Sequence, residues 1–247
     1  MQAIHIPKVD ARYWTAILLA SIFGTNLGDL YAHESGLGIV SGLAVLAAIV
    51  GLAYFFERTD SRAHQVWYWL AIIVIRTGAT NIADYMAFRM RLNMMGLCVA
   101  LAVIIAVLAI WQARSVHANK VSHDGRLGGL PATNARYWWA MLAAGVFGTV
   151  LGDVCSHEIG GGMASIVLSA LLLVTLLVGR TGLLQTLYFY WLAVAVARTA
   201  GTAVGDWLAE SRDLNIGLPL CTVLTGLAFV GVLFVWRSRA EPQAVAA

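Results

Sequence analysis

The apolar residues of this sequence are gathered into runs of about 18 or more, the length that a helix needs to cross a bilayer core of about 30 Å. The 247 residues are 60% hydrophobic and only 12% charged. That charged share is about half of what a soluble domain carries, so too little polar surface remains to cover a water-soluble globule. We therefore predict an all-α integral membrane protein.

Eight spans are predicted from the hydropathy pattern, and the basic residues at their ends and between them indicate how they are oriented. The spans cover residues 12–34, 38–56, 66–88, 95–113, 136–158, 163–179, 184–209 and 216–236. The side that holds both termini carries eleven basic residues: Lys8, Arg12, Arg58, Arg62, Arg114, Lys120, Arg126, Arg136, Arg180, Arg237 and Arg239. The other side carries three: Arg89, Arg91 and Arg212. By the positive-inside rule, both termini are expected in the cytoplasm.

The two halves of the sequence are copies of one another. Ala11-Arg12-Tyr13-Trp14 recurs as Ala135-Arg136-Tyr137-Trp138, an offset of 124 residues. Gly28-Asp29 recurs as Gly152-Asp153 at the same offset. Matches at a constant offset indicate an internal duplication.

A shorter pattern, small-Thr-x-x-small-Asp, occurs once in each odd-numbered span. The four copies run from Gly24 to Asp29, from Ala79 to Asp84, from Gly148 to Asp153 and from Gly201 to Asp206. Each odd-numbered span and the even-numbered span after it then form one hairpin, and all four hairpins share one orientation. This predicts parallel repeats about an axis along the membrane normal. Two small residues four positions apart also let helices approach closely, so we expect the odd-numbered helices to form an inner bundle.

The predicted fold is thus eight transmembrane helices, arranged as four parallel helical-hairpin repeats in two tandem four-helix halves around a pseudo-symmetric inner bundle. The expected divisions are a first half at 1–113 (hairpins 12–56 and 66–113), a cytoplasmic linker at 114–135, a second half at 136–237 (hairpins 136–179 and 184–236) and a tail at 238–247.

The recurring Gly-Thr-x-x-Gly-Asp element and the hairpin period resemble a bacterial integral membrane family known by its internal repeat, the repeat of unknown function numbered 347. The second copy departs from the pattern, because Ala79 and Ala83 replace the glycines and Phe88 stands where the other copies have a polar residue. The resemblance covers nearly the whole chain. It implies this fold and a location in the bacterial cytoplasmic membrane, and it implies no activity.

Carboxylates inside a membrane need compensation, since one at the bilayer centre costs about 2.5–3.5 kcal/mol. Residues four apart lie on one helix face, so each Asp shares a stripe with a Thr one turn earlier. The candidate ion- or ligand-binding residues are Asp29, Asp84, Asp153, Asp206, Thr25, Thr80, Thr149, Thr202, Glu210, Arg76 and Arg198. Four aspartates and two arginines leave a net charge of −2. One divalent cation, two protons, or protonated His33 and His157 would balance it.

The first and third copies also offer a metal site, because His33 follows Asp29 by four residues as His157 follows Asp153. Two carboxylates and two imidazoles suit borderline metals such as Zn²⁺ or Mn²⁺. The same two histidines are alternatively placed to be the axial ligands of one haem.

The leading functional hypothesis is a small transporter or exporter for a divalent metal cation, with proton coupling as an option, that uses a central Asp/His site between the repeats. The alternatives are a bis-histidine haem redox protein and a structural membrane protein in which the arginines pair with the aspartates. The sequence contains no nucleophile motif and no zincin motif, so an enzyme is not expected. The expected partners are the lipid bilayer and small cations or protons. Nucleic acid is not expected, since the basic residues are scattered by topology.

Aromatic residues near the ends of the spans are assigned to the belt at the membrane–water interface. They are Tyr13, Trp14, Trp67, Trp69, Tyr137, Trp138 and Trp139.

Overall fold

The computed structural model describes residues 7, 9–34, 36, 38–59, 65–119, 135–180 and 187–239, and within these ranges the chain is helical and contains no strand. The elements are α1 (Ala11–Glu34), α2 (Gly38–Thr59), α3 (Gln65–Asp84), the π-helix η1 (Tyr85–Arg89), α4 (Met94–Asn119), α5 (Ala135–Ile159), α6 (Gly161–Arg180), α7 (Leu187–Glu210) and α8 (Leu218–Arg239). The all-α class predicted from the sequence is confirmed. Most of the expected linker and tail lies outside the described residues.

Among the described residues, six segments are long and apolar enough to cross a membrane. They are Gln65–Arg89, Met94–Gln112, Ala135–Ile159, Gly161–Gly179, Leu187–Glu210 and Leu218–Val235, and Gly38–Ala53 of α2 is a shorter apolar stretch. These segments indicate a multi-pass membrane protein, as the composition predicts. Burial separates them into two groups, because 50–72% of the most apolar window is buried in α3, α5 and α7 but only 22–28% in α4, α6 and α8.

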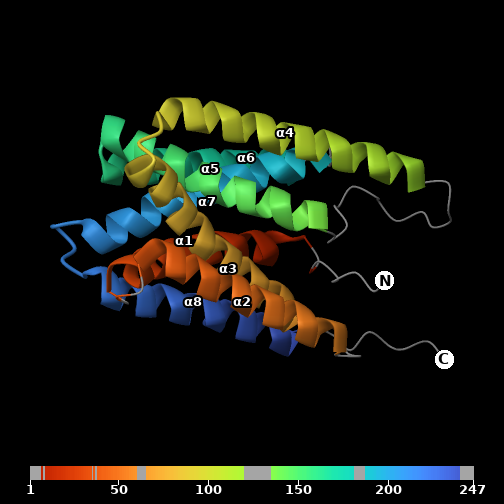
Figure 1. Cartoon of the computed structure of the whole chain (residues 1–247), viewed down its shortest axis with the longest axis horizontal. Coiled ribbons are helices and arrows are strands. Elements are labelled where there is room, and N and C mark those ends of the chain that lie inside the picture. The colour runs from red at the N-terminus through yellow and green to blue at the C-terminus, as the bar shows by residue number, and fades with distance from the viewer. Residues whose placement is uncertain are drawn as a thin grey trace.

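Together with α1, the inner helices α3, α5 and α7 form a closed ring of four helices. Contacts join α1 to α3, α3 to α5, α5 to α7 and α7 back to α1, while α8, α2, α4 and α6 pack on α1, α3, α5 and α7 respectively (Figure 1). Each inner helix contributes one fully buried apolar side chain at the same repeat position: Ile17, Ile72, Met141 and Val194. These four residues, the apolar layer, place the core of the protein on the axis of the ring.

Glycine is required where the inner helices touch. A Cβ atom on Gly24 of α1 would lie 2.5 Å from Cγ of Arg76 in α3. A Cβ atom on Gly148 of α5 would lie 2.5 Å from Cβ of Arg198 and 2.7 Å from a backbone carbon of α7. The other two contacts place Gly201 of α7 against Ser21 of α1, and Gly145 of α5 against Ala79 of α3. All four contacts in the ring therefore depend on a missing side chain, which is how helices approach closely in lipid.

We predict that Gly148→Ala destabilises the protein, because the added methyl group meets backbone atoms that cannot move aside. Overpacking of this kind costs about 1–3 kcal/mol. The control is Gly231→Ala in α8, where an added Cβ meets nothing within 4 Å. Thermal unfolding in detergent should show a lower midpoint for Gly148→Ala and an unchanged or higher one for Gly231→Ala, since alanine favours helices. Equal midpoints would contradict the close contact.

Candidate functional site

The four inner helices carry one polar series in the same register. Counted from a tyrosine, a variable position follows after 8 residues, a threonine after 12 and an aspartate after 16. The series is Tyr13, Ser21, Thr25 and Asp29 in α1; Tyr68, Arg76, Thr80 and Asp84 in α3; Tyr137, Gly145, Thr149 and Asp153 in α5; and Tyr190, Arg198, Thr202 and Asp206 in α7. A row of residues four apart runs obliquely around a helix, so helices must cross at an angle for the whole row to face one axis. Figure 1 shows such a crossing, with α3 running obliquely across its neighbours.

The four tyrosine hydroxyls form a closed ring at the end of the bundle where α1 begins, the proximal end. The oxygen–oxygen distances are 2.8 Å from Tyr13 to Tyr68, 2.7 Å from Tyr68 to Tyr137, 2.9 Å from Tyr137 to Tyr190 and 2.6 Å from Tyr190 to Tyr13. Around such a ring each hydroxyl can donate one hydrogen bond and accept another. All four side chains are buried. This tyrosine ring closes the proximal end of the axis.

The tyrosine ring corrects an interpretation made from the sequence. Tyr13 and Tyr137 were assigned to the interfacial belt, but both are fully buried and hydrogen-bonded at the axis. Trp69 is also buried, at 3% exposure, and packs in the core. The signal that was missed is the constant spacing of 16 residues from each tyrosine to the aspartate of the same repeat.

The side chain of Arg76 joins all four inner helices. Its Nη1 donates hydrogen bonds to Thr80 at 2.9 Å and to Thr149 at 2.8 Å, and its Nη2 donates to Thr25 and to Thr202. These four bonds use all four protons of the two terminal nitrogens. Arg76 is 0% exposed, and the four threonines, the threonine ring, are 2% exposed or less.

Three of the four threonine hydroxyls are oriented by their own helices. Thr25, Thr80 and Thr202 each donate to the carbonyl oxygen four residues earlier, at 2.9, 3.5 and 3.2 Å. A hydroxyl that donates to its own helix keeps its lone pairs for another donor. The threonine ring is therefore prepared to accept hydrogen bonds from a cationic group on the axis.

Arg198 occupies the equivalent position in α7, but its side chain extends toward the opposite end. Its Nη1 donates to Oγ of Ser21 and its Nη2 contacts Sδ of Met141, both at 3.3 Å. Met141 belongs to the apolar layer, so this guanidinium lies on the tyrosine side of the threonine ring. A structural network would pair the two arginines directly with carboxylates. Within the described part of the chain, neither Arg76 nor Arg198 donates a hydrogen bond to a carboxylate.

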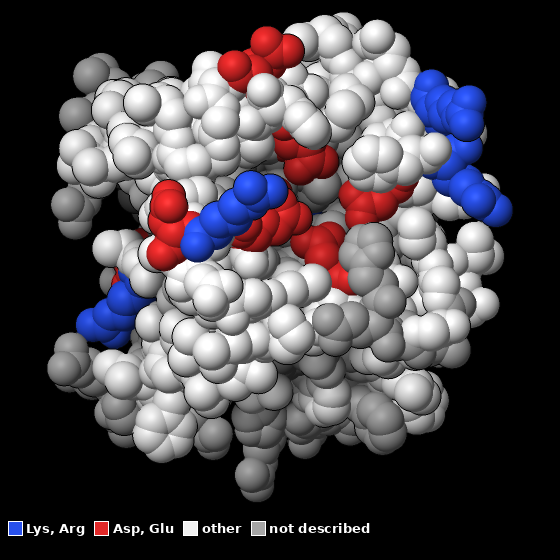
Figure 2. All heavy atoms as spheres, turned by 90° about the vertical axis from the view of Figure 1, so that its left-hand side faces the viewer, with Lys and Arg blue, Asp and Glu red and all other residues white. Residues whose placement is uncertain are grey.

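The aspartates lie one helical turn beyond the threonine ring, toward the end where α1 finishes, the distal end. Asp29 interacts electrostatically with Asp84 and Asp153, and Asp206 interacts with Asp29 and Asp153. Arg76 interacts electrostatically with Asp29, Asp153 and Asp206. All four aspartates are half-buried. Figure 2 looks onto the distal end and shows acidic side chains gathered around its centre. These four residues are the aspartate ring.

The outermost candidates do not complete a compact metal site in the described residues. Glu210 is exposed and interacts with Asp29, Asp153 and Asp206, and His157 is exposed. Within the described ranges, no three His, Cys, Asp or Glu side chains are close enough to hold a metal ion. The side chain of His33 lies outside the described residues. The Asp29, His33, Asp153 and His157 metal set and the bis-histidine haem therefore stay predictions.

We predict that Tyr68→Phe destabilises the protein by about 1–3 kcal/mol, because two buried hydrogen bonds are lost and two neighbouring hydroxyls lose a partner. The control is Tyr188→Phe in α7, whose side chain is 52% exposed. Thermal unfolding in detergent should distinguish the two variants. If Tyr68→Phe unfolds at the midpoint of the control, the ring contributes no stability.

Residues 12–59 and 189–241 match the family model described as Repeat of Unknown Function (DUF347). The first match contains α2 and nearly all of α1, and the second contains α8 and nearly all of α7. Each match therefore spans one odd-numbered helix and the even-numbered helix that follows it. No curated protein and no solved structure matches the chain.

Proposed function

Because the chain carries the DUF347 repeat, whose description names no activity, we propose a function from the axial site: a small membrane transporter for a divalent cation. The observation that supports it most strongly is the common register of three four-membered layers. The tyrosine ring closes one end of the axis, the threonine ring holds a guanidinium in the middle, and the aspartate ring is half-buried at the other end.

The proposed architecture is eight transmembrane helices in four parallel hairpins, forming two tandem halves. Three observations support it. The polar series has the same register in α1, α3, α5 and α7, these helices pack in cyclic order, and each family match covers one hairpin. Repeats related by an axis along the membrane normal place a substrate site where the repeats meet.

The charges on the axis favour a cation as the substrate. Four carboxylates and two guanidiniums leave a net charge of −2, which one divalent cation or two protons would balance. Rings of acidic side chains are the usual entry sites of cation pathways. Because no three described acidic or histidine side chains come within metal-binding distance, we propose a cation that keeps part of its hydration shell, as Mg²⁺ commonly does.

Arg76 has the role of a tethered cation in this proposal. Its guanidinium fills the threonine ring directly below the aspartate ring, so a cation that arrives from the distal end stops above it. Below Arg76, the apolar layer and the tyrosine ring close the axis. Passage therefore requires a second state in which the proximal end opens, as in alternating access. Protons bound to the aspartates and the bound cation neutralise the same negative charge of the aspartate ring. Protons and the cation therefore exchange for one another at this site.

We predict that Asp29→Asn and Asp153→Asn lower cation transport about tenfold or more, since a hydrogen bond or contact to a charged group contributes about 1.5–3 kcal/mol. The matched control is Glu158→Gln, which removes an exposed carboxylate from the distal end of α5. The assay is uptake of Mg²⁺, Mn²⁺ and Zn²⁺ into proteoliposomes that contain a pH-sensitive dye. The thermal unfolding midpoints of the Asp29→Asn and Asp153→Asn variants must stay near that of the wild type, so that a loss of transport does not reflect unfolding.

Two results would count against the proposal. If the Asn variants transport like the wild type, the aspartate ring is not the binding site. If the wild type moves none of the three cations and the Asn variants only unfold at lower midpoints, the axial residues form a structural network instead.

The proposed orientation places both termini in the cytoplasm, because eleven basic residues lie on that side against three on the other. Reporter fusions after Ala118 and after Ala247 are expected to give a cytoplasmic signal, and a fusion after Asn93 an external one. An external signal from the C-terminal fusion together with a cytoplasmic one after Ala118 would exclude four spans in the second half.

A further inference from the structure

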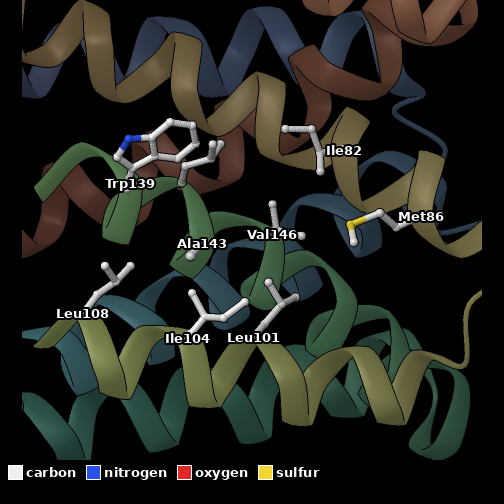
Figure 3. Close-up of a pocket in the computed structure, with 9 residues that line it drawn as sticks. Ile82, Met86, Leu101, Ile104, Leu108, Trp139, Ala143 and Val146 are labelled. Carbon is white, nitrogen blue, oxygen red and sulfur yellow. The ribbon is translucent and has the colours of Figure 1, made fainter. Parts of the chain in front are cut away.

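An apolar groove opens on the outer surface of the bundle between α3, α4 and α5. Its volume is about 360 Å³. Figure 3 shows Ile82 and Met86 on one wall, Leu101 and Leu108 of α4 on the other, and Trp139 and Val146 of α5 between them. The groove runs along α4 and α5. Every side chain that lines it is apolar.

The groove exists because α4 leaves α3 after the turn that joins them. The π-helix η1 follows α3, and α4 begins at Met94. The other outer helices each also pack against the inner helix that precedes them, whereas α4 packs along α5 and reaches α7. A hydrogen bond of 3.1 Å from Trp191 to Gln112 holds α4 there. Ile104 and Trp139, at 46% and 65% exposure, form a rim that faces the surroundings of the bundle.

A positively charged side chain, that of Arg136, lies at the proximal end of the groove. The guanidinium carbon of Arg136 lies 3.8 Å from the ring centroid of Trp111. Trp111 follows the lining residue Leu108 by three positions, and Arg136 precedes Trp139 by three, so the pair sits about one helical turn beyond the groove. Within the described part of the chain, no carboxylate pairs with Arg136. The stacked ring supports one face of the guanidinium and leaves its N–H edge available.

We propose that this groove binds one anionic phospholipid, with an acyl chain between α3 and α4 and its phosphate at Arg136. The apolar walls match the chain, and the cation at one end matches the phosphate. Arginine binds phosphate through paired N–H groups. Basic residues beside grooves between membrane helices are where anionic headgroups collect. This inference depends on the placement of the protein in a membrane and does not depend on the proposed transport.

The internal duplication provides a matched control. Arg12 in α1 is the counterpart of Arg136, and Thr15 stands where α5 has Trp139. Arg12 is exposed. On that side α8 packs tightly on α1, with Phe23 against Gly226 and stacked on Phe229 at a centroid distance of 6.4 Å. Arg12→Gln and Arg136→Gln therefore remove the same charge from equivalent helix positions, and the groove between α3, α4 and α5 lies beside Arg136.

The experiment measures binding of phosphatidylglycerol and phosphatidylcholine to the full chain in detergent, by native mass spectrometry. We expect Arg136→Gln to weaken phosphatidylglycerol binding about fivefold, the effect of one basic residue at a membrane surface. Arg12→Gln should change it less than twofold. Ala143→Phe fills the groove and should abolish retention of the lipid. If Ala143→Phe does not fold, Ile104→Trp at the rim is used in its place and should have the same effect.

Four results would overturn the proposal. Equal losses in Arg12→Gln and Arg136→Gln would show diffuse attraction to the surface. Equal binding of the two lipids would remove the role of the headgroup charge. Competition by inorganic phosphate alone would show that the acyl chain is not recognised. A wild-type dimer that the groove-filling variant dissociates would show that a second copy occupies the groove.

Discussion

The buried guanidinium of Arg76 fixes the positions of the four inner helices relative to one another. It is fully buried and bonded to one threonine from each helix. A charge in this position costs several kcal/mol unless hydrogen bonds and countercharges compensate it. The threonine ring supplies the hydrogen bonds, and the aspartate ring one turn away supplies the charge. Because the guanidinium is a rigid planar fork, it accepts only one register of the four helices.

The two arginines break the fourfold repetition of the axis. Tyrosine, threonine and aspartate occur in every copy, but the intermediate position is Ser21, Arg76, Gly145 and Arg198 in successive copies. Small residues alternate with arginines, so each long side chain has room beside a short one. Two guanidiniums at one level would repel each other. The structure separates them along the axis, with Arg76 bonded to the threonine ring and Arg198 extended toward Met141.

The sequence predicts the helices and the stripes of the site better than it predicts the contacts that the stripes make. Threonine and aspartate four residues apart had to share a face, and the structure places both on the axis. The direction of a long side chain is not encoded in helical spacing, so the opposite orientations of Arg76 and Arg198 could not be predicted. Tyr13 and Tyr137 were misassigned because a position near the end of a span is typical of interfacial residues.

The oblique crossing of the helices explains why the side chains meet at one end of the axis and not at the other. Crossing helices diverge on both sides of their closest approach, which the glycine contacts place near the threonine ring. Tyrosine is long enough to close the gap at the proximal end, and aspartate is too short to do so at the distal end, consistent with the lack of a three-ligand metal site in the described residues. In the proposed transporter, opening the tyrosine ring requires the same four helices to change their crossing. That change necessarily alters the spacing of the threonines around Arg76, so the proximal closure and the ion site are coupled through one side chain.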